Sequence, residues 1–132
     1  MTEAVEGFVL DASVLLALIN NEAGADVVID ALRLPDTVIS AVNYSEVVAK
    51  LISIGMPAEV VQYTLQPLSL TIYDFDGELA EKAGFLYLTT KKLGLSFGDR
   101  ACLALADHLG LPALTADQAW KQLKDIKVRT LR

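Results

Sequence analysis

Phe8-Val9-Leu10-Asp11-Ala12-Ser13 is the stretch that decides the fold class, because it joins a short apolar run directly to a helix. The first three residues are typical of a buried strand, and the apolar residues from Val14 to Ile19 indicate a largely buried helix. A strand that passes straight into a helix is the first part of an α/β unit. Asp11 lies at the junction between the two.

The same alternation continues along the chain. Further strands are predicted at 37–40, 70–73, 113–115 and 128–130, and further helices at 22–33, 41–54, 57–65, 76–93, 98–109 and 117–124. Short apolar strands that alternate with helices predict a three-layer α/β/α fold with a mainly parallel sheet of four to five strands. In such folds the functional residues gather at the carboxyl ends of the strands.

Length and composition predict a single domain over residues 1–132, since 53% of the residues are hydrophobic and no linker or repeat interrupts the chain. The longest nearly apolar stretch, 8–19, is too short and too polar to span a membrane. Glu3 and Glu6 stand where a secretory leader carries lysine or arginine. We therefore expect a cytoplasmic protein with no membrane span.

The few cysteine and histidine residues exclude several kinds of site. Cys102 is the single cysteine and lies in an apolar run, which favours a buried, inert thiol. His108 is the single histidine, which excludes zinc sites with several His or Cys ligands and any mechanism that needs two histidines. It falls in the last turn of a predicted helix, where a cation is favourable, and no G-x-S-x-G motif accompanies it.

The formal net charge of −6 argues against a protein that grips nucleic acid through a broad basic surface. Acidity is compatible with nucleic-acid chemistry if several carboxylates hold a cation that meets the phosphate. Lys91, Lys92 and Arg100 lie near one of the candidate acids, and the tail from Lys121 to Arg132 is also basic. This pattern fits a modest basic rim or an ordinary solvated surface, and spacing does not separate the two.

Four acids, Asp11, Glu46, Asp99 and Asp117, each stand beside an apolar element rather than in a charge run. Taken singly, each has an ordinary explanation. Asp11 and Asp117 could cap the helices that follow them, and Asp99 could form a capping box with Ser96. Glu46 could simply face water from one side of its helix.

Placed together on a parallel sheet, the four acids could converge at one edge, because two follow strand ends and two lie near the starts of helices. Crowded carboxylates repel one another unless a cation neutralises them. Oxygen ligands suit Mg²⁺ or Mn²⁺, which can activate a water molecule against a phosphodiester. The hydroxyls of Ser13 and Thr115 could hold a carboxylate or the phosphate, although ordinary cap and strand-end roles fit their spacing equally well.

Four motifs resemble those of the PIN domain, and specifically the VapC-type toxins of prokaryotic toxin–antitoxin pairs. These motifs are Phe8-Val-Leu-Asp11-Ala-Ser13 with Glu22 beyond, Ile39-Ser-Ala-Val-Asn-Tyr-Ser-Glu46-Val-Val, Leu95-Ser-Phe-Gly-Asp99, and Leu114-Thr-Ala-Asp117-Gln-Ala-Trp120. Each motif is weak alone, but their order and spacing cover nearly the whole chain.

The resemblance implies a PIN fold, Mg²⁺- or Mn²⁺-dependent hydrolysis of RNA, a homodimer, and neutralisation by a small antitoxin. It places Asp11, Glu46, Asp99 and Asp117 on the family's acidic positions. It places Ser13 and Thr115 on the accompanying hydroxyls. Arg100 departs from the small apolar residue usual after the third acid, so it could contact an RNA phosphate or an antitoxin carboxylate, or be a plain surface arginine.

Three rival functions share parts of this pattern. A receiver-like phosphoacceptor domain would have adjacent acids after the first strand, whereas Leu10 and Ala12 flank Asp11. A haloacid-dehalogenase-like phosphatase would have a second aspartate where the chain has Ser13. A catalytically silent PIN-like module that only binds a partner stays open.

Overall fold

A five-stranded sheet runs through the computed structural model, which describes residues 6–132. Glu3, one of the two acids near the N-terminus, lies outside the described residues. The strands are β1 (Val9–Leu10), β2 (Val38–Ser40), β3 (Ile72–Tyr73), β4 (Ala113–Thr115) and β5 (Val128–Thr130). Their order is β3-β2-β1-β4-β5, and every neighbouring pair is parallel. The predicted α/β class and parallel sheet are confirmed.

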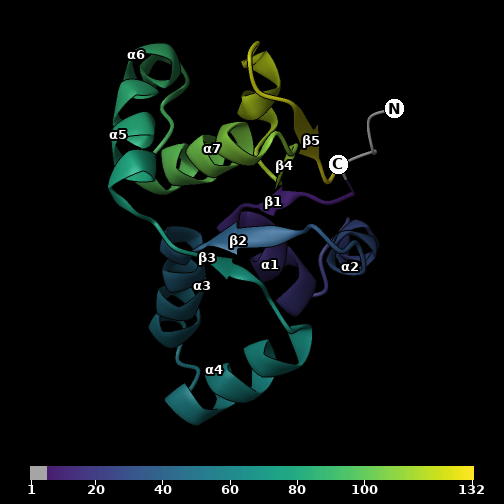
Figure 1. The fold of residues 1–132 in the computed structure, drawn as a ribbon. Coiled ribbons are helices and arrows are strands. Elements are labelled where there is room, and N and C mark those ends of the chain that lie inside the picture. The colour runs from purple at the N-terminus through teal and green to yellow at the C-terminus, as the bar shows by residue number, and fades with distance from the viewer. Residues whose placement is uncertain (1–5) are drawn as a thin grey trace.

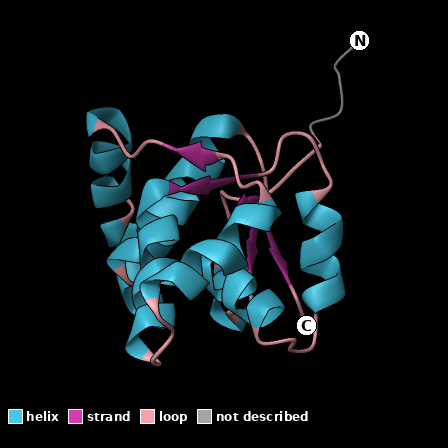
Figure 2. Ribbon diagram, turned by 90° about the horizontal axis from the view of Figure 1, so that it is seen from below, coloured by secondary structure: helices cyan, strands magenta, loops and turns pink. Residues whose placement is uncertain are grey.

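Helices enclose the sheet from both sides (Figures 1 and 2). They are α1 (Ala12–Ile19), α2 (Ala25–Leu32), α3 (Ala41–Ser53), α4 (Ala58–Leu65), α5 (Gly77–Phe85), α6 (Tyr87–Thr90) and α7 (Phe97–Leu109). The described residues also form 3₁₀ turns: η1 (Gln66–Leu68) after α4, η2 (Lys91–Leu93) after α6, and η3 (Gln118–Gln122) after β4. Among the described residues, no helix combines the length and the apolar character needed to cross a membrane.

The strand side chains divide the core into two clusters. Leu10 and Leu114 point into the cluster that holds the apolar faces of α1 to α4. Val9 and Ala113 point the other way, into the cluster formed with α5, α7 and the fully buried Trp120. Successive side chains of a strand alternate between its two faces, so burial of both faces explains why the strands are apolar throughout.

The single helix expected over 76–93 is wrong, because the structure divides it into α5, α6 and η2, with a turn at Leu86. The hydroxyls of Thr89 and Thr90 donate to the Leu86 carbonyl oxygen, at 3.2 and 2.8 Å. Threonine hydroxyls that bond nearby carbonyls compete with the regular helix pattern and bend helices.

Two other helix boundaries differ from the expectation. α2 begins at Ala25 rather than at residue 22, because Gly24 precedes it in the left-handed conformation with φ 96°. The segment expected as a helix over 117–124 is the 3₁₀ turn η3. The second difference lies directly after β4, where the chain leaves the edge of the sheet that carries the candidate acids.

The position of β1 in the centre of the sheet brings distant parts of the chain together. Leu10 is in register with Leu114 on the neighbouring strand β4, and the backbone N–H of Asp11 donates to the Leu114 carbonyl at 3.0 Å. Asp11, which follows β1, and Thr115, the last residue of β4, therefore lie side by side although 104 positions separate them.

Candidate active site at the carboxyl edge of the sheet

Asp11 is the centre of the candidate site. Its side chain is only 5% exposed, and it accepts hydrogen bonds from the hydroxyls of Ser13 at 2.6 Å and Thr115 at 3.0 Å. The residue stands at the N-cap position of α1, yet its side chain makes no capping bond. The helix-cap explanation for Asp11 is therefore wrong, and its carboxylate faces the other side chains of the site.

The two hydroxyls also bind the loop that follows β4. Ser13 Oγ accepts from the backbone N–H of Ala116 at 3.0 Å, and Thr115 Oγ1 accepts from that of Asp117 at 3.1 Å. Both hydroxyls therefore hold the Asp11 carboxylate and the β4 loop in one arrangement. Sequence spacing left open whether the hydroxyls hold a carboxylate or have ordinary cap and strand-end roles. The contacts show that each hydroxyl binds both the Asp11 carboxylate and a backbone N–H of the loop after β4.

Glu46 reaches the site from α3, and it is held there by a residue whose role the sequence did not reveal. Asn43 is fully buried, and its Nδ2 donates to Glu46 Oε1 at 2.8 Å and to the Gly98 carbonyl at 2.9 Å. The absence of a side chain at Gly98 makes room for the Glu46 carboxylate, because an added Cβ would collide with it. The spacing of Asn43 three residues before Glu46 on one helix face was the available signal.

Asp99 lies at the start of α7, directly after Gly98. It forms the predicted capping box: Ser96 Oγ accepts from the Asp99 N–H at 3.2 Å, and the Asp99 carboxylate accepts from the Ser96 N–H at 2.9 Å. The capping bond uses Oδ2 alone. The capping role therefore leaves the other oxygen of Asp99 available to the site.

The charges of three acids act on one another. The pKa of Asp11 is raised from 3.8 to about 6, first because the carboxyl is buried, and further because the charges of Asp99 and Glu46 lie close by; the hydrogen bonds from Ser13 and Thr115 oppose this rise. The same three acids, after burial itself, raise the pKa of the Cys102 thiol well above its usual value. The buried thiol is therefore protonated, as expected for an inert cysteine.

Asp117 is the acid that the structure does not bring fully into this group. It is exposed, and its Oδ1 accepts from the Ala119 N–H at 2.9 Å as the cap of η3, so the capping explanation is confirmed for this residue. Its link to the other acids runs through its backbone N–H and the Thr115 hydroxyl. The structure therefore joins Asp11, Glu46 and Asp99, with Asp117 beside them.

The donor chemistry of this group fits a hard divalent cation. Among residues 6–132, no three Asp, Glu, His or Cys side chains already stand in the arrangement of metal ligands. The group nevertheless offers only oxygen donors, holds repelling carboxylates, and includes the buried Asn43 Oδ1, for which no hydrogen-bond partner is present among the described residues. Oxygen donors with an uncompensated negative charge suit Mg²⁺ or Mn²⁺ better than zinc.

Arg100 lies beside the acids but is held away from them. Its guanidinium carbon lies 5.5 Å from the centre of the Tyr87 ring and 6.0 Å from that of Phe97, and its Nη1 donates to the Ala83 carbonyl at 3.4 Å. The side chain is half-buried. It is therefore fixed on two aromatic rings, unlike a plain surface arginine.

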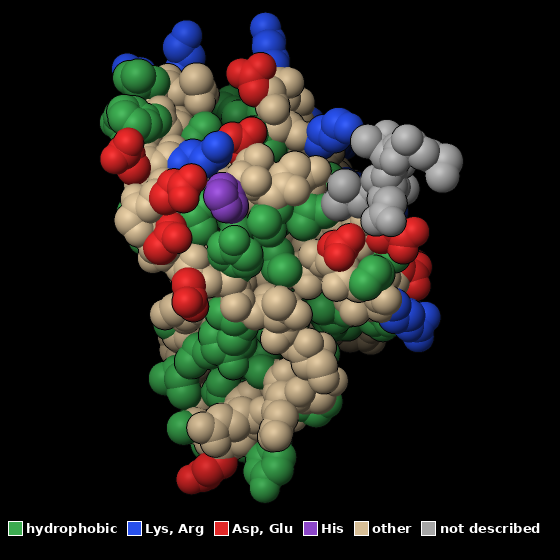
Figure 3. Space-filling view, in the orientation of Figure 1, with side chains coloured by type: hydrophobic (Ala, Val, Ile, Leu, Met, Phe, Trp, Pro, Cys, Tyr) green, Lys and Arg blue, Asp and Glu red, His purple; other side chains and the backbone are tan. Residues whose placement is uncertain are grey.

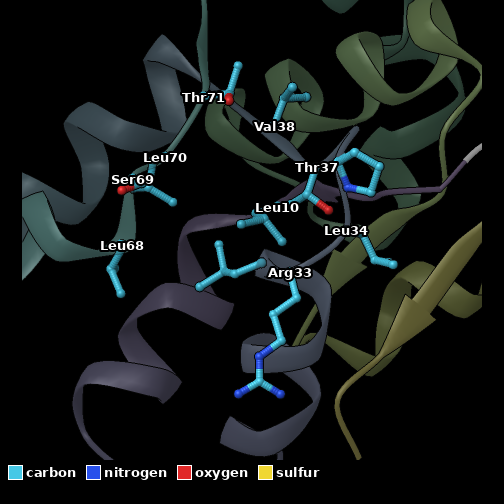
Figure 4. Close-up of a pocket in the computed structure, with 11 residues that line it drawn as sticks. Leu10, Arg33, Leu34, Thr37, Val38, Leu68, Ser69, Leu70 and Thr71 are labelled. Carbon is cyan, nitrogen blue, oxygen red and sulfur yellow. The ribbon is translucent and has the colours of Figure 1, made fainter.

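A cavity of about 240 Å³ lies elsewhere, near the start of β2 (Figure 4). Its lining includes Leu34, Thr37 and Leu70 and none of the four candidate acids. The candidate site at the edge of the sheet is therefore separate from this pocket.

The fold and the arrangement of the acids can now be compared with known proteins. A family model for the PIN domain matches residues 8–126, which is most of the chain and includes all four acids. The chain belongs to the PIN domain family. Among curated proteins, none matches it in sequence.

Solved structures similar to this PIN domain share its fold at low sequence identity. One is a toxin–antitoxin complex from Klebsiella pneumoniae, with a TM-score of 0.76, 22% identity, and coverage of 96% of this chain and 98% of that one. Another is DNA-bound VapBC from Salmonella typhimurium, with a TM-score of 0.76, 17% identity, and coverage of 96% and 98%. VapBC2 from Rickettsia felis, bound to a promoter DNA fragment, has a TM-score of 0.75, 18% identity, and coverage of 93% and 97%.

Proposed function

We propose that this PIN domain, one functional unit over residues 1–132, is an Mg²⁺- or Mn²⁺-dependent endoribonuclease. Asp11 carries this proposal: a buried carboxylate with a raised pKa, held by two hydroxyls at the edge of the sheet and repelled by Asp99 and Glu46. Uncompensated acids of this kind are costly to keep unless they serve a function, and a divalent cation would remove the cost.

In the proposed mechanism the carboxylates of Asp11, Glu46 and Asp99 would hold the cation, and the Asp117 oxygen that its cap bond does not use would complete the set. When bound, the cation supplies an activated water and stabilises negative charge on the leaving oxygen. The Ser13 and Thr115 hydroxyls orient Asp11, and Asn43 fixes one Glu46 oxygen. The backbone N–H of Asp117 donates to the Thr115 hydroxyl, which keeps the loop after β4 close to the other acids.

An RNA cleavage assay tests the proposal. Purified protein is incubated with structured RNAs and Mn²⁺, with and without chelator, beside Asp11→Asn, Asp99→Asn and the control Asp30→Asn. Asp30 is an exposed acid at the end of α2, paired there with Arg33. We expect chelator-sensitive cuts that both site variants lose by a factor of about 100 or more, while Asp30→Asn cleaves like the wild type.

Other results would contradict the nuclease. Phosphorylation of Asp11 by a small phosphodonor without RNA cleavage would favour the receiver-like function. No cleavage of any RNA, together with unchanged partner binding in Asp11→Asn, would favour a catalytically silent PIN module.

We further propose that the protein is the toxin of a VapBC-like pair, acting as a homodimer in the cytoplasm and restrained by a small antitoxin. The similar structure from Klebsiella pneumoniae is a toxin–antitoxin complex, and those from Rickettsia felis and Salmonella typhimurium are VapBC bound to DNA, which supports an antitoxin partner. Exposed apolar side chains at the end of α3, Ile52 and Ile54, support a protein-binding surface (Figure 3). Sedimentation at micromolar concentration tests the dimer, and a monomer would refute it.

A further inference from the structure

Two exposed aromatic side chains lie against Arg100, the residue that follows the candidate acid Asp99. Phe97 is 52% exposed and Tyr87 is 54% exposed, and Phe97 lies two residues before Asp99. The Arg100 guanidinium lies against both rings, at 5.5 and 6.0 Å from their centres. We call Tyr87, Phe97 and Arg100 the aromatic platform.

The platform is held in place from behind. Phe75, which follows β3, packs edge-on against Phe97 with the ring centres 5.7 Å apart and the planes at 82°. Arg100 is anchored by its bond to the Ala83 carbonyl, while its Nε has no hydrogen-bond partner among the described residues. A ring held by a neighbouring ring keeps one orientation, so little conformational entropy is lost when a planar ligand stacks on it.

The chemistry of this surface fits a nucleobase. Aromatic rings and a guanidinium plane are the groups on which unpaired bases stack, whereas the bases of a duplex already cover one another's faces. The chain carries a net charge of −6, so a broad basic surface cannot supply the affinity for RNA. Stacking supplies an attraction that does not depend on net charge, and Lys91 and Lys92 follow α6 within the same segment.

We propose that the aromatic platform stacks an unpaired nucleotide of a single-stranded RNA segment next to the bond to be cut. The inference rests on the proposed nuclease function and adds a substrate-positioning site to it. What is new is the set of residues that position the substrate: the rings of Tyr87 and Phe97, with Arg100 against both. The platform holds no part of the cation site.

The test uses binding, measured separately from cleavage. The probe is a single-stranded oligoribonucleotide of about ten nucleotides, a length that single-strand-binding domains commonly cover. It carries one 2-aminopurine, whose fluorescence falls on stacking. It is titrated with the full chain in chelator, beside Phe97→Ala, Phe97→Trp, Tyr87→Ala and the control Tyr63→Ala. Tyr63 is a 77% exposed ring on α4, on the opposite side of the molecule from α6 (Figure 1).

We expect Phe97→Ala and Tyr87→Ala to weaken binding by roughly five- to one-hundred-fold and to lose the fluorescence change, the range that one stacked base supplies. Phe97→Trp should restore both, because tryptophan also offers a ring, and Tyr63→Ala should bind like the wild type. A duplex of the same sequence should bind at least tenfold more weakly. Thermal melts of each variant confirm that the fold is kept.

Two results would overturn the platform. One is wild-type protein that binds duplex as well as single strand, or that binds the probe without a fluorescence change. The other is Phe97→Ala that binds and quenches normally but changes the sedimentation coefficient, which would make the patch a protein interface. Cleavage with Mn²⁺ is assayed in parallel: normal cleavage by Phe97→Ala with normal quenching refutes only the platform, whereas a wild type that quenches but never cuts refutes only the nuclease.

Discussion

Asp11 ionises at a cost to the fold, and this gives the protein a characteristic dependence on pH. Its pKa is about 6 in the folded chain and 3.8 as a free side chain, so the folded state binds more protons between these values. The contribution of Asp11 to the free energy of unfolding therefore falls by about 3 kcal/mol as pH rises from about 4 to 6. Above pH 6 this contribution no longer changes. We expect Asp11→Asn to be more stable than the wild type above pH 6 in chelator, and to differ little from it near pH 4.

Urea denaturation of both proteins from pH 4 to pH 8 measures this difference in the free energy of unfolding. The other carboxylates are the same in both proteins, so their effects cancel when the two curves are subtracted. Asp30→Asn, which alters an exposed acid, should follow the wild type at every pH. Stability curves of Asp11→Asn and the wild type that run parallel across the range would contradict the raised pKa of Asp11.

Thr115 links the acid to the loop through one hydroxyl, so its replacement by an isosteric residue separates shape from hydrogen bonding. Thr115→Val removes the donor to Asp11 and the acceptor for the Asp117 N–H. Because Thr115 is fully buried, we expect a loss of about 1–3 kcal/mol in stability and a fall of at least tenfold in cleavage. Denaturation and single-turnover cleavage measure the two effects, and full activity in Thr115→Val would refute its orienting role.

At the scale of the elements, the contact of α3 with α7 sets the position of Glu46. Gly98 leaves the space in which the Glu46 carboxylate lies, and the collision that a Cβ would cause falls on the end of a flexible side chain. We expect Gly98→Ala to keep or slightly raise the melting temperature, because alanine favours a helix, and to lower cleavage by tenfold or more by displacing Glu46.

Gly84→Ala is the matched control, since Gly84 is also helical and a Cβ there meets nothing within 4 Å. It should gain stability by about 0.5–1 kcal/mol with unchanged activity. If Gly98→Ala and Gly84→Ala cleave RNA equally well, the packing of Glu46 on Gly98 does not matter for function.

At the scale of the whole molecule, a cation should stabilise the fold by joining acids that come from separate parts of the chain. Binding to the folded state alone adds about 2.7 kcal/mol at a cation concentration 100 times Kd, which raises the melting temperature by several degrees. We expect Mn²⁺ to produce this rise in the wild type at pH 7 and little of it in Asp11→Asn. Equal shifts in both proteins would show that the cation binds elsewhere.

The sequence by itself determined the fold class, because strands buried on both faces must be apolar and must alternate with helices that cover them. It also determined the capping box of Ser96 and Asp99, whose hydrogen bonds span only three residues. Predictions from local patterns failed at Leu86, where two threonine hydroxyls also donate to the helix carbonyl. They failed again at Asp11, whose carboxylate does not cap the helix that follows it.

Only the tertiary structure decided how the acids meet. The register of β1 with β4 places Thr115 against Asp11 across 104 residues, and the contact between α3 and α7 places Asn43 and Glu46 against Gly98. It also showed Asp117 as a cap of η3, set apart from the three coupled charges. Such contacts depend on strand order and helix packing, which join residues far apart in the chain and leave no periodic trace in the sequence.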